Sequence, residues 1–271
     1  MKKVLLVITT SLCAAAAAFG ALGDVLNSFP APATYPIALG IAGDYTNFLW
    51  VYCNASPFRI YQISGITGSL LSSYVSPQGS ATRGLTYSYN GGGGLPSGSY
   101  LWMGNYGTDY IYRCNSGNGS VYASIPANHD MILGIAVTAT GDGGSAPTYM
   151  LSSDDYAAYM YRQALTTGSI YSSWTVAADV CDIAWDWRNA VVWTGRGDNY
   201  VYGYRTTGSL AASFRIPNDY PVGFCYTTNY LWVSCTIGIR PADYIYRIHC
   251  PLVPNLSVEP ASVGRIKSLF K

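Results

Sequence analysis

The chain has 271 residues, only 11% of them charged, and a formal net charge of +1. Ordinary globular domains carry about 25% charged residues, so this surface must be built mainly from uncharged polar and aromatic side chains. Residues 24–250 contain ten Arg, no Lys, thirteen Asp and no Glu. This composition leaves no basic face, and we therefore expect no nucleic-acid partner.

The first 23 residues predict a secretory signal peptide. Two lysines precede an alanine-rich apolar run over residues 4–19, which is too short and wrongly flanked for a membrane span. Small residues favour cleavage after Gly20 or Gly23. No second long apolar run follows. We expect a mature chain without a transmembrane segment, either secreted or held at the cell surface.

A block of about 45 residues then recurs five times, a period typical of β-propellers. Each block opens on a small-residue start: Gly40-Ile41-Ala42, Gly84-Leu85-Thr86, Gly134-Ile135-Ala136, Asp182-Ile183-Ala184 and Gly223-Phe224-Cys225. An apolar pair follows: Leu49-Trp50, Leu101-Trp102, Tyr149-Met150 as the degenerate copy, Val192-Trp193 and Leu231-Trp232. A Tyr-rich strand comes next, and four blocks close with Gly-Ser and an apolar run. Four short strands per block predict an all-β, five-bladed propeller with four-stranded blades over residues 24–250.

The fifth block ends at Cys250 without its closing strand. A matching strand stands before the first block, since residues 23–30 repeat the pattern of residues 208–214. We therefore predict that the ring closes when this N-terminal strand pairs with the last blade.

The same strand allows a second interpretation. If it entered the last blade of another molecule, the contact would run head to tail and build oligomers or filaments. The residues that would carry this assembly are Asp24, Val25, Leu26 and Phe29. The chain itself is then a candidate partner.

The blocks resemble bacterial exported propeller repeats of the YVTN and NHL type, which read roughly Gly-Leu-Ala-Trp-Asp, Leu-Trp-Val, Ile-Tyr-Arg and Thr-Gly-Ser. The best copy of the first element is Asp182-Ile183-Ala184-Trp185-Asp186. The resemblance covers about residues 23–250. It implies the fold, while similar propellers include lyases and cyclotransferases as well as pure binding proteins.

No catalytic motif stands out in this sequence. Propeller glycosidases need a carboxylate pair, and the one Glu of the chain, Glu259, follows the repeats. His129-Asp130 is either an acid–base pair, half a metal site or a simple turn. Asp109 precedes a Tyr-rich strand, as Asp243 does in the last block, and is predicted to cap backbone N–H groups.

The candidate binding surface is the propeller face that carries the connections between blades and the loops between second and third strands. We call it the connection face. Its candidates either lack a counterpart in the other blocks or are loop tyrosines that the repeat does not explain: Tyr106, His129, Asp130, Asp154, Asp155, Tyr156, Arg196, Asp198 and Tyr220. We expect no catalytic residues, no metal and no cofactor.

Six cysteines remain after the signal peptide, and six allow fifteen disulfide connectivities. Cys225 and Cys235 lie on the first two strands of the last block and are the first candidate pair. The alternative is that the cysteines are buried thiols that pack as small apolar residues.

Residues 251–271 are expected to form a Pro-rich linker and a short amphipathic C-terminal tail. From these observations we predict an exported, non-enzymatic propeller that serves as an extracellular or cell-surface binding or structural module. Its partner is either another copy of the chain, through the N-terminal strand, or an extracellular protein or polysaccharide. The alternative is a lectin-like carbohydrate-binding propeller. The third hypothesis is a hydrolase or lyase that uses loop Asp and His residues.

Overall fold

The computed structural model describes residues 21–32, 38–44, 47–90, 97–138, 148–154, 158–176, 180–216, 220–227, 230–236 and 244–251. Most of the predicted signal peptide, the C-terminal tail from residue 252, and the candidate residues Asp155 and Tyr156 lie outside this part of the chain. Within it, no helix is long and apolar enough to cross a membrane.

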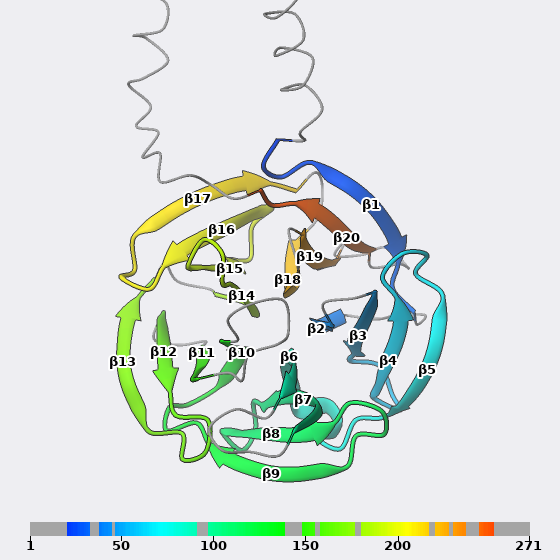
Figure 1. The fold of residues 1–271 in the computed structure, drawn as a ribbon, viewed down its shortest axis with the longest axis vertical. Helices are drawn as coiled ribbons and strands as arrows, with labels where there is room; N and C mark the ends of the chain where they lie inside the picture. The colour runs from blue at the N-terminus through cyan, green and yellow to red at the C-terminus, as the bar shows by residue number, and fades with distance from the viewer. Residues whose placement is uncertain are drawn as a thin grey trace, which may run out of the picture.

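The described strands form five antiparallel four-stranded sheets around one axis, which confirms the predicted five-bladed propeller (Figure 1). From the axis outward, blade 1 consists of β2 (Ala38–Gly43), β3 (Phe48–Cys53), β4 (Arg59–Ser64) and β5 (Leu70–Val75), and blade 2 of β6 (Thr82–Asn90), β7 (Ser97–Asn105), β8 (Tyr110–Asn115) and β9 (Val121–Pro126). In the same order, blade 3 consists of β10 (Ile132–Val137), β11 (Met150–Asp154), β12 (Tyr159–Gln163) and β13 (Ile170–Thr175), and blade 4 of β14 (Ile183–Asp186), β15 (Val191–Gly195), β16 (Tyr200–Arg205) and β17 (Leu210–Arg215). Blade 5 consists of β18 (Tyr220–Thr227), β19 (Tyr230–Thr236), β20 (Tyr244–His249) and, outermost, the N-terminal strand β1 (Val25–Pro30). A short 3-10 helix, η1 (Gly79–Ala81), lies between blades 1 and 2.

The N-terminal strand closes the ring, as predicted. Strand β1 pairs with β20 of the same chain, from Val25 opposite Ile248 to Pro30 opposite Tyr244. The Gly23 N–H donates to the His249 carbonyl at 3.1 Å, and the pairing thus extends beyond the strand itself. The assembly residues therefore lie in an intramolecular sheet, and the same exchange between molecules stays a prediction.

Close packing explains the glycine that precedes the outermost strand of each blade. Gly68 has φ +72°, and a Cβ there would come within 2.6 Å of the Phe29 ring in the preceding outer strand. Gly23 has φ +92° and meets Phe214 in the same way. Left-handed backbone and close approach both require glycine. The outer strands therefore follow one another around the ring with a glycine turn packed on each predecessor.

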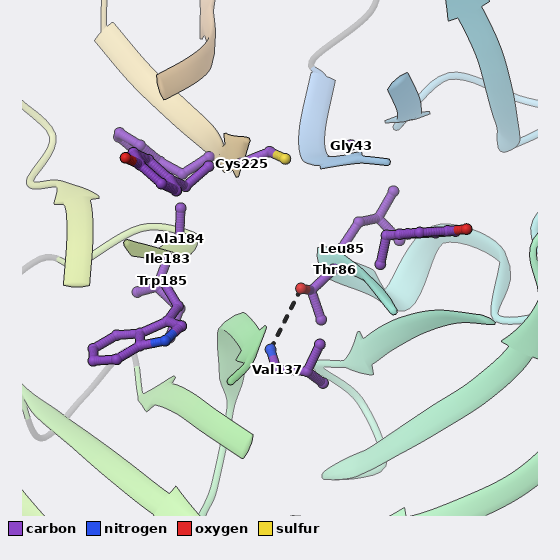
Figure 2. A pocket seen from close by; sticks show the side chains of 11 residues that line it. Gly43, Leu85, Thr86, Val137, Ile183, Ala184, Trp185 and Cys225 are labelled. Atoms are coloured by element: carbon purple, nitrogen blue, oxygen red, sulfur yellow. Dashed lines mark hydrogen bonds between the residues drawn. The ribbon is translucent and has the colours of Figure 1, made fainter. Parts of the chain in front are cut away.

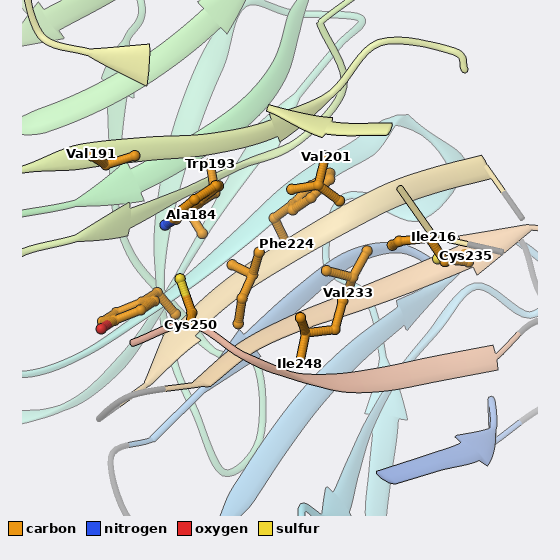
Figure 3. Close-up of a cluster of buried hydrophobic side chains, with 12 residues drawn as sticks. Ala184, Val191, Trp193, Val201, Ile216, Phe224, Val233, Cys235, Ile248 and Cys250 are labelled. Atoms are coloured by element: carbon orange, nitrogen blue, oxygen red, sulfur yellow. The ribbon is translucent and has the colours of Figure 1, made fainter. Parts of the chain in front are cut away.

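Tryptophans fill the space between blades at one repeated register. Trp50, Trp102, Trp193 and Trp232 each face a small inner-strand residue, whereas blade 3 places Leu151 opposite Ala136. The degenerate apolar pair is thus Met150-Leu151, one residue later than predicted. Figure 3 shows one such layer, in which Trp193, Phe224 and Val233 pack between blades 4 and 5.

The predicted Cys225–Cys235 disulfide is wrong. Cys225 lies opposite Trp232, and Cys235 lies opposite Pro221, so the two thiols occupy different ends of the β18–β19 hairpin. None of the six described cysteines is in a disulfide. Five are buried, and burial raises the pKa of the Cys114 thiol to about 12, which keeps this thiol protonated and unreactive.

We expect iodoacetamide to modify the described cysteines in denaturant without any reductant, because no disulfide protects them. In the folded protein, buried Cys114 should be modified far more slowly than partly exposed Cys181. Peptide mass spectrometry of both samples measures this. A Cys225–Cys235 peptide that appears only after reduction would contradict the structure.

Candidate active site

The connection between blades 2 and 3 positions His129. Residues 127–131 run from β9 to β10, and Asn128 and Met131 have φ of 57° and 53°. Asp109, in the turn between β7 and β8, holds this segment: its carbonyl accepts from Ala127 N at 2.9 Å and its Oδ1 accepts from Met131 N at 2.7 Å. Asp109 therefore caps a backbone N–H, as predicted, but that N–H belongs to the neighbouring connection.

The imidazole of His129 contacts three groups, two from blade 3 and one from its own connection. It stacks on the Tyr161 ring with 4.3 Å between centroids and 10° between planes. Its Nε2 lies 2.7 Å from Ser152 Oγ. Its Nδ1 lies 3.2 Å from the carbonyl oxygen of Asp130. These contacts fix both the plane and the rotation of the ring.

The two ring nitrogens have different roles. A carbonyl oxygen only accepts, so the hydrogen bond to Asp130 assigns the ring proton to Nδ1. Nε2 then carries the lone pair and accepts the hydroxyl proton of Ser152. Ser152, His129 and the Asp130 carbonyl thus form the order of hydroxyl, base and orienting acceptor on which nucleophilic catalysis depends.

Burial favours the neutral form of this imidazole. Burial lowers the pKa of His129, while the Asp130 carbonyl and the carboxylates of Asp154, Asp109 and Asp130 oppose that change. Asp154 is 5% exposed, and its Oδ2 accepts from the Tyr161 hydroxyl at 3.5 Å. Burial, followed by Asp154, raises the pKa of Tyr161. A neutral base next to acidic groups can accept a proton and have its positive charge stabilised.

Ser152 is a functional candidate that the sequence analysis missed. It is fully buried in β11, opposite Ile135. The other blades have Val51, Met103, Thr194 and Val233 at this register. Its neighbour Ser153 is equally buried, but its hydroxyl donates to the Cys181 carbonyl at 3.2 Å. The available signal was a Ser-Ser pair between the apolar Met150-Leu151 and Asp154 in one strand.

The structure brings together three of the predicted binding residues, His129, Asp130 and Asp154. Arg196 and Asp198 form a separate group on blade 4, where both contact Tyr202: the guanidinium lies 5.0 Å from the ring centroid and Asp198 Oδ2 accepts from the hydroxyl at 2.7 Å.

The remaining described candidates lie on other blades. The Arg83 guanidinium lies 5.4 Å from the Tyr106 ring on blade 2, and Tyr220 is exposed at the start of β18. The predicted surface is therefore several local clusters, of which the His129 cluster combines an imidazole, a serine hydroxyl and carboxylates.

A pocket on the axis is too small for an organic substrate. The inner strands of all five blades line it, with Thr86, Trp185 and Cys225 among its side chains (Figure 2). A water-sized sphere can occupy about 20 Å³ of it. A cavity needs about 10–15 Å³ by this measure to hold one water molecule, so the axial pocket suits a water molecule.

Comparisons with known proteins give the fold and little else. No protein-family model matches the chain, and no curated protein matches it. Among solved structures, the glutaminyl cyclase of Myxococcus xanthus is similar, with a TM-score of 0.59 and 8% sequence identity over 84% of this chain and 97% of that one. At this identity the likeness shows a shared fold.

This comparison corrects our functional prediction. The similar structure is that of an enzyme, which contradicts the expectation of a non-enzymatic binding or structural module and of its lectin-like alternative. The expectation rested on missing sequence motifs. Such motifs cannot reveal pairs like Ser152 and His129, which are 23 residues apart in sequence and meet only in the folded chain.

Proposed function

We propose that this propeller is an acyl-transfer enzyme that acts on an amide, with Ser152 as nucleophile and His129 as general base and acid. The observation that carries the proposal is the 2.7 Å contact between Ser152 Oγ and His129 Nε2. The Asp130 carbonyl orients the base from the other side of the ring. Asp109 and Asp154 lie close enough to favour its charged form.

The reaction follows from these contacts. Ser152 Oγ attacks the amide carbonyl carbon as its proton moves to His129 Nε2. The imidazolium then gives that proton to the departing nitrogen, which leaves an acyl ester on Ser152 and a neutral base. An amine of the acceptor attacks the ester, its proton passes through Nε2, and Ser152 regains its hydroxyl. An amine within the same substrate yields a cyclic product.

The choice of an amide substrate has support from the comparison. The similar structure is named a glutaminyl cyclase, and cyclisation of a glutaminyl residue replaces an amide nitrogen by an amine. Ser152 has no exposed surface in the structure, so substrate reaches it only after a local opening of the connection face. Such gating steps are common in enzymes that exclude water from an acyl intermediate.

The cellular location of the enzyme and the relation of its blades to known repeats are inferred from the sequence. The signal peptide predicted for residues 1–23 would place the enzyme outside the cytoplasm. The Leu-Trp and Tyr-Ile-Tyr-Arg elements support a relation of its blades to exported YVTN- and NHL-type repeats.

A fluorophosphonate reagent tests the nucleophile without knowledge of the substrate, because it reacts with serines that a neighbouring base activates. We expect the folded wild-type protein to be modified at Ser152 and the Ser152→Ala variant to lose this modification. Ser153→Ala is the matched control, since it removes a neighbouring hydroxyl of equal burial that contacts a carbonyl oxygen instead. Peptide mass spectrometry identifies the site. A wild-type protein that remains unmodified at Ser152 would refute the proposal.

The rate of this modification should depend on the protonation of His129. Because burial lowers the pKa of His129 below its ordinary value of about 6.5, the base stays neutral at pH 6.5, and the rate should fall only at lower pH. His129→Gln should reduce the rate by about 100-fold or more, as for loss of a general base. Rates across pH 4–8 measure both effects; an unchanged rate in His129→Gln would remove His129 from the mechanism.

A further inference from the structure

One carboxylate occupies the propeller axis near the connection face. The first residue of the repeat is Gly in blocks 1, 2, 3 and 5, whereas block 4 has Asp182 there. Asp182 is 2% exposed. Its Oδ1 accepts from the N–H of Ile183 at 2.9 Å, and its Oδ2 accepts from the N–H of Phe224 at 3.1 Å. Its carboxyl also accepts backbone hydrogen bonds from Ile135 and Ile41.

These four donors come from four different blades. Each belongs to the residue that follows the first position of its block, so the repeat directs the same N–H toward the axis from β2, β10, β14 and β18. Convergent backbone N–H groups form a concave site for anions. Burial raises the pKa of this carboxyl well above its ordinary value, and the four backbone N–H groups oppose that rise.

Glycines at the starts of blades 2 and 3 leave room for the Asp182 side chain. A Cβ on Gly84 would lie 2.9 Å from Asp182 Oδ1, and a Cβ on Gly134 would lie 2.8 Å from Asp182 Cα. The glycines bring the inner strands close enough for their N–H groups to reach one shared carboxylate. The absence of side chains at Gly84 and Gly134 therefore leaves the space that the Asp182 side chain fills.

We propose that the inner-strand N–H groups form a carboxylate-binding site on the propeller axis, which this chain fills with the side chain of Asp182. The site joins four blades through one group. Its ligand class is a small planar carboxylate. When the side chain is removed, formate has the size and charge to take its place.

Chemical rescue tests this site. Asp182→Gly makes the fourth block start like the others and leaves the donors without their acceptor. In the full-length protein we expect this variant to melt several degrees below the wild type. Sodium formate should raise its Tm in a saturable manner, because a ligand that binds only the folded state stabilises it. Formate should have no comparable effect on the wild type, whose site is already filled.

Asp198→Gly is the matched control. Asp198 also accepts from a backbone N–H, that of Tyr200 at 3.0 Å, but it lies in a turn on one blade. Its variant should lose stability without rescue by formate. Equal responses to formate in the wild type and both variants would overturn the proposal. If Asp182→Gly does not fold in chloride, the measurement is refolding in formate, and failure to fold in both salts overturns it as well.

Discussion

Replacement of Phe29 by alanine should lower the free energy of unfolding by about 4 kcal/mol, within the range for large-to-small changes of buried aromatic side chains. Phe29 is 6% exposed although it lies on the outermost strand of its blade. Its ring centroid is 6.1 Å from that of Trp232, and it packs with Ile41 and Ile63 of blade 1. The side chain therefore joins the last blade to the first. Urea titration of the folded protein measures the loss.

Val25→Ala is the control for this prediction. Val25 lies on the same strand and pairs opposite Ile248, but 43% of it is exposed. Its truncation should change the free energy of unfolding by about 0.5 kcal/mol, as is usual for surface positions. Similar losses in the two variants would mean that β1 adds backbone pairing without a buried contact between blades 5 and 1. Closure would then not depend on Phe29.

The sequence predicted the features of the fold that each blade repeats. The Trp positions and the glycine turns are local packing rules, and each recurs in at least four blades. The displaced strand before blade 1 supplies the one element that the last block lacks. The position of the apolar pair was predicted less accurately in blade 3. There the apolar pair was placed one residue early, because Leu151 replaces the expected Trp and removes the clearest marker of register.

The site depends on departures from the repeat, and these have no second copy to confirm them. Ser152 and His129 are hydrogen-bonded across 23 positions of sequence, a contact that only the β10–β11 register and the preceding connection create. The cysteine prediction failed for the opposite reason. Neighbouring strands were assigned correctly, but strand adjacency does not give register, and the register separates Cys225 from Cys235.

The role of Asp182 could not be predicted from the sequence alone. Its departure from glycine is visible in the printed blocks, but a lone Asp at a strand start has many ordinary explanations, such as a turn. Its role requires the inner strands of the other blades to converge on one axis. That convergence is a property of the closed ring, so no single block contains the information.

The same convergence makes Gly134→Ala a severe substitution. A Cβ at this position would lie 2.6 Å from Ile183 N and 2.8 Å from two backbone atoms of Asp182. Backbone atoms of a neighbouring inner strand cannot move aside as a flexible side chain can. We expect a loss of about 3 kcal/mol in the free energy of unfolding, the upper end of the usual cost of overpacking. Thermal and urea unfolding of the variant measure it.

Gly107→Ala makes the same chemical change where space exists. A Cβ there would meet Asn105 Oδ1 at 3.6 Å and Ala81 Cβ at 3.7 Å, which are ordinary contacts. It should alter stability by about 0.5 kcal/mol or less. Gly134→Ala should also weaken the Asp182 site, because moving β14 away from β10 separates the carboxylate from its Ile135 donor. An equally small effect at both glycines would mean that the inner strands are farther apart than the structure shows, and the shared axial carboxylate would lose its geometric basis.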